Sequence, residues 1–326
     1  MKAIVYERYG APEVLQLKEV EKPTPKDNEI LIKIHATTVT SGDWRMRSLD
    51  VPTGFRLIVR LVTGISAPKQ PILGSELAGE VEAVGKTVSK FKVGDRVFAF
   101  SGIKMGCYAQ YKCMPEEGTV LLKPKNLSDA EAASLSFGGT TVLDFFRRAK
   151  LRRGEHVLIN GASGSVGTAA IQLAKHFGAE ITAVCSTGNV ELVRSLGANH
   201  IIDYTQEDFA RNGHTYDVIM DIAGTAPFSR SKHSLTAHGR LLLVLARLPD
   251  MLPIPWVAIT SHKKIIAGPA AERLEDLQLL ANLAEIGSFK PVIDRIYPFE
   301  QMVEAHRYVD TGRKKGNVVI TVEHQP

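Results

Sequence analysis

One eight-residue stretch limits the possible fold more than any other part of this sequence. It reads Asn160-Gly161-Ala162-Ser163-Gly164-Ser165-Val166-Gly167. Residues 156–160 before it are typical of a strand, and residues 165–177 after it predict a helix that a glycine closes. A second strand is expected at 180–185. This order of strand, glycine-rich turn, helix and strand predicts a dinucleotide-binding loop rather than an ordinary turn.

The small residues of this stretch have different expected tasks. The pattern from Ala162 is A-x-G-x-x-G, in which Ala162 permits a tight turn and Gly164 lets the backbone approach a pyrophosphate. Gly167 lets the helix pack against its strand. Ser165 and Val166 begin the helix, whose free N–H groups and positive dipole end favour phosphate. We expect all five residues to contact the cofactor.

The end of the second strand indicates which dinucleotide binds. Enzymes that use NAD usually carry an Asp or Glu there, about 20 residues past the glycines, to hold the ribose hydroxyls. This chain instead has Cys185-Ser186-Thr187-Gly188-Asn189, without a carboxylate. Hydroxyl and amide donors accept a 2′-phosphate, so we expect NADP(H) on Ser186, Thr187 and Asn189. Further candidates for cofactor contacts are Arg194, Tyr204, Ala223 and Gly224, although Arg194 could equally decorate a solvent-facing helix.

Strands and helices alternate in the middle of the chain, after a capping pattern at Ser128 and Glu131. Strands are expected at 156–160, 180–185, 200–203, 218–222, 240–246 and 263–267. Six β-branched strands that alternate with helices predict an α/β fold with a parallel, doubly wound sheet.

The two ends of the chain have a different pattern. Residues 1–125 contain short β signals between turn residues, for example a strand expected at 14–20 and the alternating Ile30, Ile32 and Ile34. After Gly287 the pattern is strand, helix and strand. We therefore place a β-rich domain at 1–125, a dinucleotide-binding domain at 126–288, and a return to the first domain at 289–326. Phe55–Val62, apolar with basic interruptions, does not fit the β pattern.

Composition excludes several other classes of protein. No apolar run in the 326 residues approaches the roughly 20 that a membrane span needs, so we expect no membrane partner. The formal charge of +5 suits an anionic cofactor, and without a recognisable binding module we expect no nucleic-acid role. Three scattered cysteines do not form a disulfide framework, which favours a reducing cytoplasm.

Several short motifs, in one order along the chain, resemble the medium-chain dehydrogenase/reductase superfamily over essentially its whole length. They are Glu29-Ile30-Leu31-Ile32-Lys33-Ile34, Gly74-Ser75-Glu76-Leu77-Ala78-Gly79-Glu80-Val81, Val93-Gly94-Asp95-Arg96-Val97, Gly138-Gly139-Thr140-Thr141, the Ala162–Gly167 motif, Ser195-Leu196-Gly197-Ala198 and Gly316-Asn317-Val318-Val319. The glycine motif and Cys185-Ser186-Thr187 look most like zinc-free quinone oxidoreductase and enone reductase members.

The resemblance implies a GroES-like N-terminal domain, a Rossmann domain, an active cleft between them and a homodimer. Zinc-dependent relatives hold their catalytic metal with Cys, the His of a Gly-His-Glu motif, and a further Cys or Asp. Here the first two positions resemble Thr40 and Ser75, and no cysteine lies near Gly138-Gly139. Hydroxyls are poor zinc ligands, so we expect no metal site. The histidines show no metal-like spacing either.

Without a metal, the least demanding hydride transfer goes to a quinone or an α,β-unsaturated carbonyl, because the resulting anion is delocalised and a few donors stabilise it. Thr40, Asp43 and Arg45 occupy the segment where family members often read Asn-Pro-x-Asp. Our hypothesis is that Arg45 or Thr40 donates to the substrate oxygen. Alternatively, Arg45 and Arg47 form surface ion pairs and Asp43 caps a turn.

Two further positions follow from the same resemblance. Thr140, after the double glycine, is similar to the residue that contacts nicotinamide. Phe55–Val62 would form part of the substrate rim, or else a plain packing helix.

The predicted function is therefore an NADPH-dependent, metal-free enzyme that transfers hydride to a quinone or an α,β-unsaturated carbonyl. One alternative is a non-catalytic, NADPH-binding protein with a sensing or nucleic-acid role, which the basic charge and the lack of an obvious acid–base residue support. A zinc-type alcohol dehydrogenase is a further alternative, disfavoured by Thr40 and Ser75.

Overall fold

The computed structural model describes residues 1–324 and divides into two compact units. Unit 1 comprises Met1–Val51, Arg56–Phe137 and Glu272–Pro326, and unit 2 comprises Pro52–Phe55 and Gly138–Ala271. The domain boundaries that we placed at 125 and 288 differ from these limits. They differ because residues 126–137, which precede unit 2 in the chain, and residues 272–288, which follow it, pack with the β-rich unit. Asn126, for example, donates from Nδ2 to the Ala284 carbonyl oxygen at 2.8 Å.

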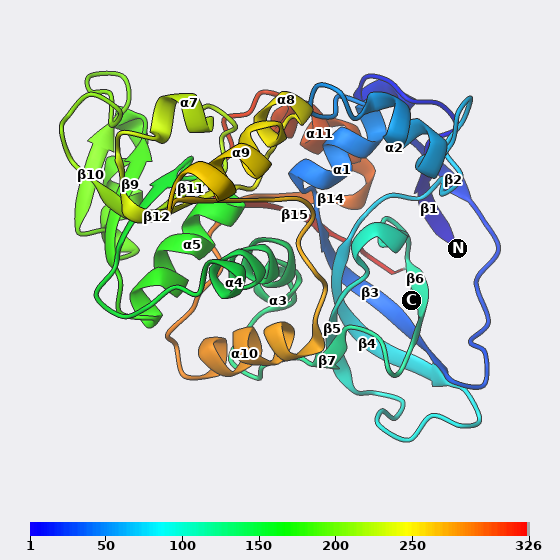
Figure 1. Ribbon diagram of the computed structural model, residues 1–326. Coiled ribbons are helices and arrows are strands. Elements are labelled where there is room, and N and C mark those ends of the chain that lie inside the picture. Colours follow the sequence, from blue (N-terminus) through cyan, green and yellow to red (C-terminus); the bar gives the residue numbers. More distant parts are fainter. Residues whose placement is uncertain (325–326) are drawn as a thin grey trace. The chain divides into compact units, whose positions relative to one another are not determined.

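Unit 2 contains a six-stranded parallel sheet of order β10-β9-β8-β11-β12-β13 (Figure 1, green to gold). Its strands are β8 (His156–Asn160), β9 (Glu180–Cys185), β10 (His200–Asp203), β11 (Tyr216–Asp221), β12 (Leu235–Leu243) and β13 (Lys264–Ala267). Its helices are α4 (Ser136–Ala149, which begins in unit 1), α5 (Ser165–His176), α6 (Val190–Ser195), α7 (Phe228–Ser231), α8 (Leu248–Met251), α9 (Pro253–Thr260) and the 3-10 turn η3 (Thr187–Asn189).

The predicted doubly wound sheet is confirmed, and its strand order creates a binding position. Strand order reverses between β8 and β11, and ligands of such sheets bind beyond the carboxyl ends of strands at this switch point. Val157, Leu158 and Ile159 of β8 are fully buried, as expected of a parallel strand covered on both faces. The core of unit 2 therefore holds rigid the strand end that precedes the glycine loop.

Unit 1 is built on a seven-stranded sheet whose path runs β14-β15-β3-β4-β5-β7, with β6 paired to β3. The strands are β1 (Lys2–Val5), β2 (Gln16–Glu19), β3 (Glu29–Thr38), β4 (Glu76–Val84), β5 (Arg96–Phe100), β6 (Tyr111–Pro115), β7 (Val120–Leu122), β14 (Ile293–Pro298) and β15 (Asn317–Thr321), with β1 and β2 forming a separate ribbon. The helical elements are η1 (Pro12–Val14), α1 (Ser41–Ser48), α2 (Arg56–Thr63), η2 (Gly102–Lys104), α3 (Asp129–Ala133), α10 (Leu274–Glu285), η4 (Phe299–Gln301) and α11 (Met302–Asp310).

Two local predictions for unit 1 are confirmed. Ile30, Ile32 and Ile34 of β3 are completely buried in its core. Ser128 and Glu131 form the predicted capping box, in which each side chain accepts a hydrogen bond from the other's backbone N–H.

Two other predictions need correction. A single strand was expected at 14–20, but the chain forms η1 and then the short β2, because Pro12 is set for the first position of a helical turn. The Phe55–Val62 stretch is helical as α2, yet none of its residues is buried, so the interpretation as a plain packing helix is wrong.

Candidate functional site

The glycine loop lies at the carboxyl end of β8 and reverses the chain into α5. The left-handed residue of the turn is Gly161, with φ of 90°, rather than Ala162, to which we had assigned the tight turn. Ala162 is instead buried, and its N–H donates to the Val184 carbonyl oxygen at 3.1 Å. The loop is therefore fastened to the end of β9.

The other two glycines have different surroundings. A Cβ atom at Gly167 would lie 2.2 Å from the Gly161 carbonyl oxygen, so only glycine allows α5 to pack here. At Gly164, which is the N-cap of α5, a Cβ atom would come no closer than 3.9 Å to any neighbouring atom. The space over Gly164 is thus open at the positive end of a twelve-residue helix that begins with Ser165 and Val166. This geometry fits a pyrophosphate.

A small polar cluster joins this loop to the end of β9. The Asn189 side-chain amide donates to the hydroxyls of Ser163 and Ser186, both at 3.1 Å. Ser186 and Asn189 were predicted from the sequence, whereas Ser163 was not. The three residues form a ready group of donors where the adenosine ribose of a dinucleotide would lie.

A carboxylate that the sequence reasoning missed lies beside this cluster. The Thr187 hydroxyl donates to Asp203 Oδ2 at 2.5 Å, and the Thr205 hydroxyl donates to Oδ1 at 2.8 Å. These hydrogen bonds, that of Thr187 first, lower the pKa of Asp203, so the group is ionised at neutral pH. The carboxyl end of β9 has no carboxylate, but Asp203 lies at the carboxyl end of the neighbouring strand β10.

Arg194 and Tyr204 are both largely exposed but have different neighbours. Arg194 forms an ion pair with Glu191 on the exposed surface of α6, as expected if Arg194 decorates a solvent-facing helix. Tyr204 follows β10, and its N–H donates to the Cys185 carbonyl oxygen at 3.0 Å. Its ring lines a cavity at the switch point.

That cavity has a volume of about 530 Å³ and opens between the ends of β8, β9 and β11. Phe209 contributes a second ring, over which the Arg230 guanidinium stacks at 5.0 Å from the centroid. Phe209 itself is only 2% exposed, so a nucleoside base in a cavity of this size would lie beside Tyr204 and Arg230. The cavity is lined by Asn160, Gly161, Val184, Tyr204, Glu207, Asp208, Phe209, Ala223, Thr225 and Arg230.

The loop after β11 carries the predicted residues Ala223 and Gly224. It is organised by Asp221, a buried carboxylate that we had not singled out. Asp221 accepts hydrogen bonds from the N–H groups of Gly224 at 3.0 Å and Ala226 at 2.8 Å, and from the Asn160 side chain at 2.8 Å. Burial raises the pKa of Asp221. The sequence did contain a signal for Asp221, because it is an acidic residue at the end of a predicted buried strand.

The double glycine explains where Thr140 lies. A Cβ atom at Gly138 would lie 2.8 Å from the Ser165 carbonyl oxygen, so glycine permits α4 to run close to the start of α5. Thr140, two residues later on α4, is buried.

In unit 1, Thr40 and Asp43 form a closed capping box at the start of α1. Asp43 Oδ2 accepts from the Thr40 hydroxyl at 2.6 Å and from the Thr40 N–H at 2.8 Å, while Oδ1 accepts from Gly74 N–H at 3.0 Å. Burial raises the pKa of Asp43 to about 6 despite these hydrogen bonds. The Thr40 proton is therefore already directed at Asp43.

The structure does not bring Arg45 together with Thr40. Five positions along a helix place them about 140° apart around α1. Arg45 Nη1 donates to the Asp50 carbonyl oxygen at 3.0 Å, and the guanidinium stacks on Trp44. Its other N–H groups have no described hydrogen bond.

Arg47 was expected at the surface but is only 1% exposed. It forms an ion pair of 2.7 Å with Asp310 and approaches His306 Nδ1 at 3.1 Å, both on α11. The surface interpretation of Arg47 is wrong because its partners come from the far end of the chain.

Ser75 and Glu76 form a second buried polar position in unit 1. The Ser75 hydroxyl is buried without a hydrogen-bond partner among residues 1–324. Glu76 accepts from the Thr38 hydroxyl and from Phe137 N–H at 2.7 Å, and burial raises its pKa to about 7. Lys314 interacts electrostatically with Glu76, and burial lowers the Lys314 pKa to about 8. The sequence reasoning quoted Glu76 only within a motif and missed Lys314.

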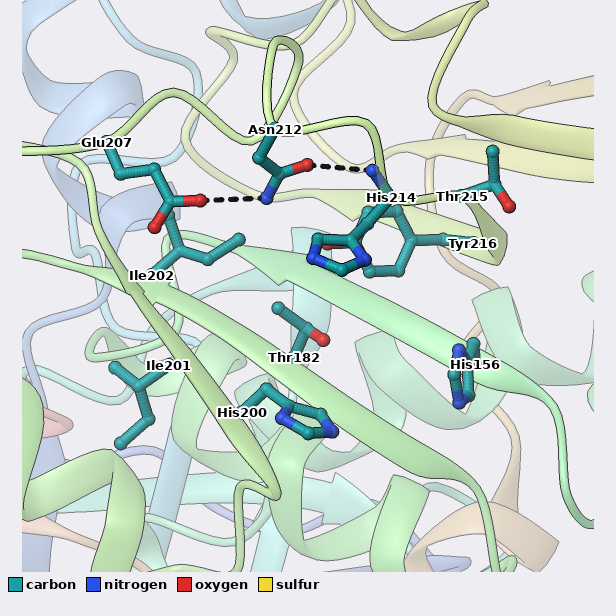
Figure 2. Close-up of a pocket in the computed structure, with 10 residues that line it drawn as sticks. All are labelled: His156, Thr182, His200, Ile201, Ile202, Glu207, Asn212, His214, Thr215 and Tyr216. Carbon is teal, nitrogen blue, oxygen red and sulfur yellow. Dashed lines mark hydrogen bonds between the residues drawn. The ribbon is translucent and has the colours of Figure 1, made fainter.

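A second cavity, of about 340 Å³, lies at the other edge of the parallel sheet, where β8, β10 and β11 begin. Figure 2 shows His156, His200 and His214 around it, with Asn212 hydrogen-bonded to Glu207 and to the His214 backbone. His156 and His200 both bond Glu180. Within the described part of the chain, no group of three or more His, Cys, Asp or Glu side chains could hold a metal ion.

Comparison with known proteins identifies the family. Residues 26–125 match the alcohol dehydrogenase GroES-like domain, and residues 196–320 match the domain described as zinc-binding dehydrogenase. The chain is 35% identical to 2-methylene-furan-3-one reductase of Solanum lycopersicum, over 98% of this chain and 79% of the relative. The chain belongs to the medium-chain dehydrogenase/reductase superfamily.

Further matches place it in the quinone oxidoreductase branch of that superfamily. Quinone oxidoreductase of Sus scrofa is 34% identical over 96% of this chain and 95% of the relative. The solved quinone oxidoreductase of Coxiella burnetii has a TM-score of 0.87 and 30% identity, with 99% of each chain covered. This medium-chain dehydrogenase/reductase is therefore an oxidoreductase that binds a pyridine nucleotide, and the predicted family and fold are confirmed.

Proposed function

We propose that this protein is an NADPH-dependent reductase that transfers hydride to a quinone or an α,β-unsaturated carbonyl without a metal. The observation that carries the proposal is the glycine loop at the start of α5, which leaves open space over Gly164 for a pyrophosphate. The same chain has Thr40 and Ser75 at the positions that resemble the metal ligands of zinc-dependent relatives. Relatives named as a quinone oxidoreductase and as an NADPH-dependent alkenal/one oxidoreductase support it.

On the cofactor side, Gly164 and the N-terminus of α5 would hold the pyrophosphate, and the cavity beside Tyr204 and Arg230 would hold the adenine. Ser186 would donate its hydroxyl proton to the 2′-phosphate, and Asn189 would hold that hydroxyl in place, because the Thr187 proton already bonds Asp203 and the Asn189 amide donates to Ser163 and Ser186. When bound, the reduced nicotinamide supplies the hydride. Thr140 remains the residue that we propose for contact with the nicotinamide.

On the substrate side, the chain must stabilise negative charge on the substrate oxygen. We propose Arg45 for this donor, because a guanidinium has five N–H groups and only one of them has a described acceptor. Thr40 would first have to break its bond to Asp43. The anion of a conjugated acceptor is delocalised and can be protonated by water, so no dedicated acid is required.

A turnover screen tests this proposal. NADPH oxidation should be followed with quinones, enals, enones, simple aldehydes and, in reverse, alcohols. Steady oxidation with conjugated acceptors alone supports the proposal. Tight NADPH binding without any turnover would instead favour the non-catalytic alternative, and rapid oxidation of simple alcohols would favour the alcohol dehydrogenase alternative.

We also propose that the enzyme is a cytoplasmic homodimer. Strand β13 is an edge of the parallel sheet, with only β12 beside it. In the same unit, α9 exposes Trp256 by 70% and Ile259 by 83%. An open strand edge next to apolar side chains suits pairing with a second copy. Analytical ultracentrifugation of wild type and Ile259→Lys tests this, with a monomeric wild type as the contradicting result.

A further inference from the structure

Helix α2 exposes its apolar side chains to solvent instead of burying them. Leu57 is 70% exposed, Ile58 52%, Leu61 56% and Val62 58%, and Ile65 just after the helix is 65% exposed. Residues separated by four positions lie one above the other on a helix, so these side chains form one stripe. The expected place of Phe55–Val62 on the substrate rim does not account for Ile65, which continues the stripe beyond that segment.

Polar contacts, rather than apolar packing, fasten α2 to its unit. The Tyr9 hydroxyl bonds the Thr63 hydroxyl at 3.0 Å and the Gly64 carbonyl oxygen at 2.9 Å. The Lys69 ammonium donates to the Leu61 and Val62 carbonyl oxygens at 3.3 and 3.0 Å, at the negative end of the helix dipole. The helix is therefore held at its C-terminal end while its apolar stripe stays uncovered.

The charge of this segment has a single sign. Arg56, Arg60 and Lys69 are its basic residues, and the sequence contains no Asp or Glu between Asp50 and Glu76. A short helix with an exposed apolar stripe and basic flanks has the chemistry of helices that lie in a membrane interface. Basic side chains near such a surface add attraction to anionic phospholipids.

We propose that α2 docks this protein on membrane surfaces that contain anionic phospholipids. A second copy of the chain fits the stripe less well, because a twofold interface would bring the same Arg56 and Arg60 together from both copies. No helix among the described residues is long and apolar enough to span a bilayer, and α2 would lie flat on its surface. The proposal revises our sequence-based expectation of no membrane partner, because the argument for that expectation considered only spanning segments.

Vesicle sedimentation of the full chain tests the proposal and needs no turnover, so it is independent of the proposed function. Wild type should sediment with vesicles of equal parts phosphatidylcholine and phosphatidylglycerol, and much less with phosphatidylcholine alone. Arg56→Gln/Arg60→Gln should weaken binding to the anionic vesicles by roughly 25-fold, since each charge near such a surface contributes about a fivefold change.

The apolar stripe is tested by Leu57→Glu/Leu61→Glu, which should weaken binding at least tenfold. The matched control is Val93→Glu/Ile286→Glu, two exposed side chains of the same unit (60% and 73% exposed) with the same change in charge. The control should lose much less affinity than the α2 variant.

If the two double variants lost equal affinity for the vesicles, the change in net charge alone would explain the loss, and the proposal would be overturned. Absence of vesicle binding by wild type would overturn it too. If that wild type were a dimer and Leu57→Glu/Leu61→Glu made it a monomer, the stripe would bind a second copy of the chain instead of a membrane.

Discussion

The Thr187 hydroxyl donates a 2.5 Å hydrogen bond to the Asp203 carboxylate, across the ends of two neighbouring strands. This contact places a negative charge beside the residues proposed to hold the 2′-phosphate of NADPH. Four donors from Thr187, Thr205 and Gln206 surround the carboxylate and satisfy it. Under the proposed function, the preference for NADPH depends on Ser186 and Asn189 acting against the charge of Asp203.

Replacement of Asp203 by asparagine should strengthen NADPH binding. Removing a negative charge near the phosphate should raise the affinity for NADPH by roughly twofold to fivefold, while the affinity for NADH changes little. Fluorescence titration with both nucleotides measures this. Glu180→Gln, with the same charge change at the other edge of the sheet, serves as the control. An equal gain for NADH, or a loss for NADPH, would show that Asp203 does not face the phosphate.

The two glycines of the loop should respond differently to alanine. Gly167→Ala forces a Cβ atom to 2.2 Å from a carbonyl oxygen and should lower stability by several kcal/mol. Gly164 has a φ of −80°, which alanine adopts readily, and a Cβ atom there would meet open space. The melting temperature of Gly164→Ala should therefore stay close to that of wild type. Its methyl group would nevertheless occupy the proposed phosphate position and weaken dinucleotide binding at least tenfold. Unchanged binding by a folded Gly164→Ala variant would place the phosphates elsewhere.

Glu76 should make stability depend on pH. Burial raises its pKa from 4.5 to about 7, so the folded state holds this proton more tightly than the unfolded state. The stabilisation by this proton is complete below about pH 4.5. The free energy of unfolding then falls by on the order of 3 kcal/mol as the pH rises from there through about 7. Glu76→Gln should flatten this part of the profile in denaturant titrations. An equally steep decline in the variant would assign the dependence to other groups, such as Asp43.

Much of unit 2 could be predicted because its signals are local. Apolar strands, helix ends and the glycine loop follow one another within short stretches, and β9 and β10 begin and end where the pattern indicated. The position of Asp203 beside Thr187 could not be predicted, since it depends on which strands become neighbours. Arg47 was misassigned for the same reason, because its partner Asp310 lies 263 residues further along the chain.

Arg45→Ala should separate a substrate-oxygen donor from a structural side chain. Loss of one good donor to a developing anion typically costs on the order of 100-fold in rate, which should appear in kcat/KM with a conjugated acceptor. NADPH affinity and the melting temperature should remain close to those of wild type, since Arg45 makes one described hydrogen bond, to Asp50. A loss of less than about threefold in rate would return Arg45 to a surface role.

The position of a transferred label tests the central claim most directly. The enzyme should be supplied with NADPH that carries deuterium at the transferable C4 position, together with an α,β-unsaturated ketone, and the product analysed by NMR. The account predicts a saturated ketone with deuterium on the carbon β to the carbonyl. Deuterium on the carbonyl carbon of an alcohol product, or no NADPH oxidation with any enone, enal or quinone, would contradict it.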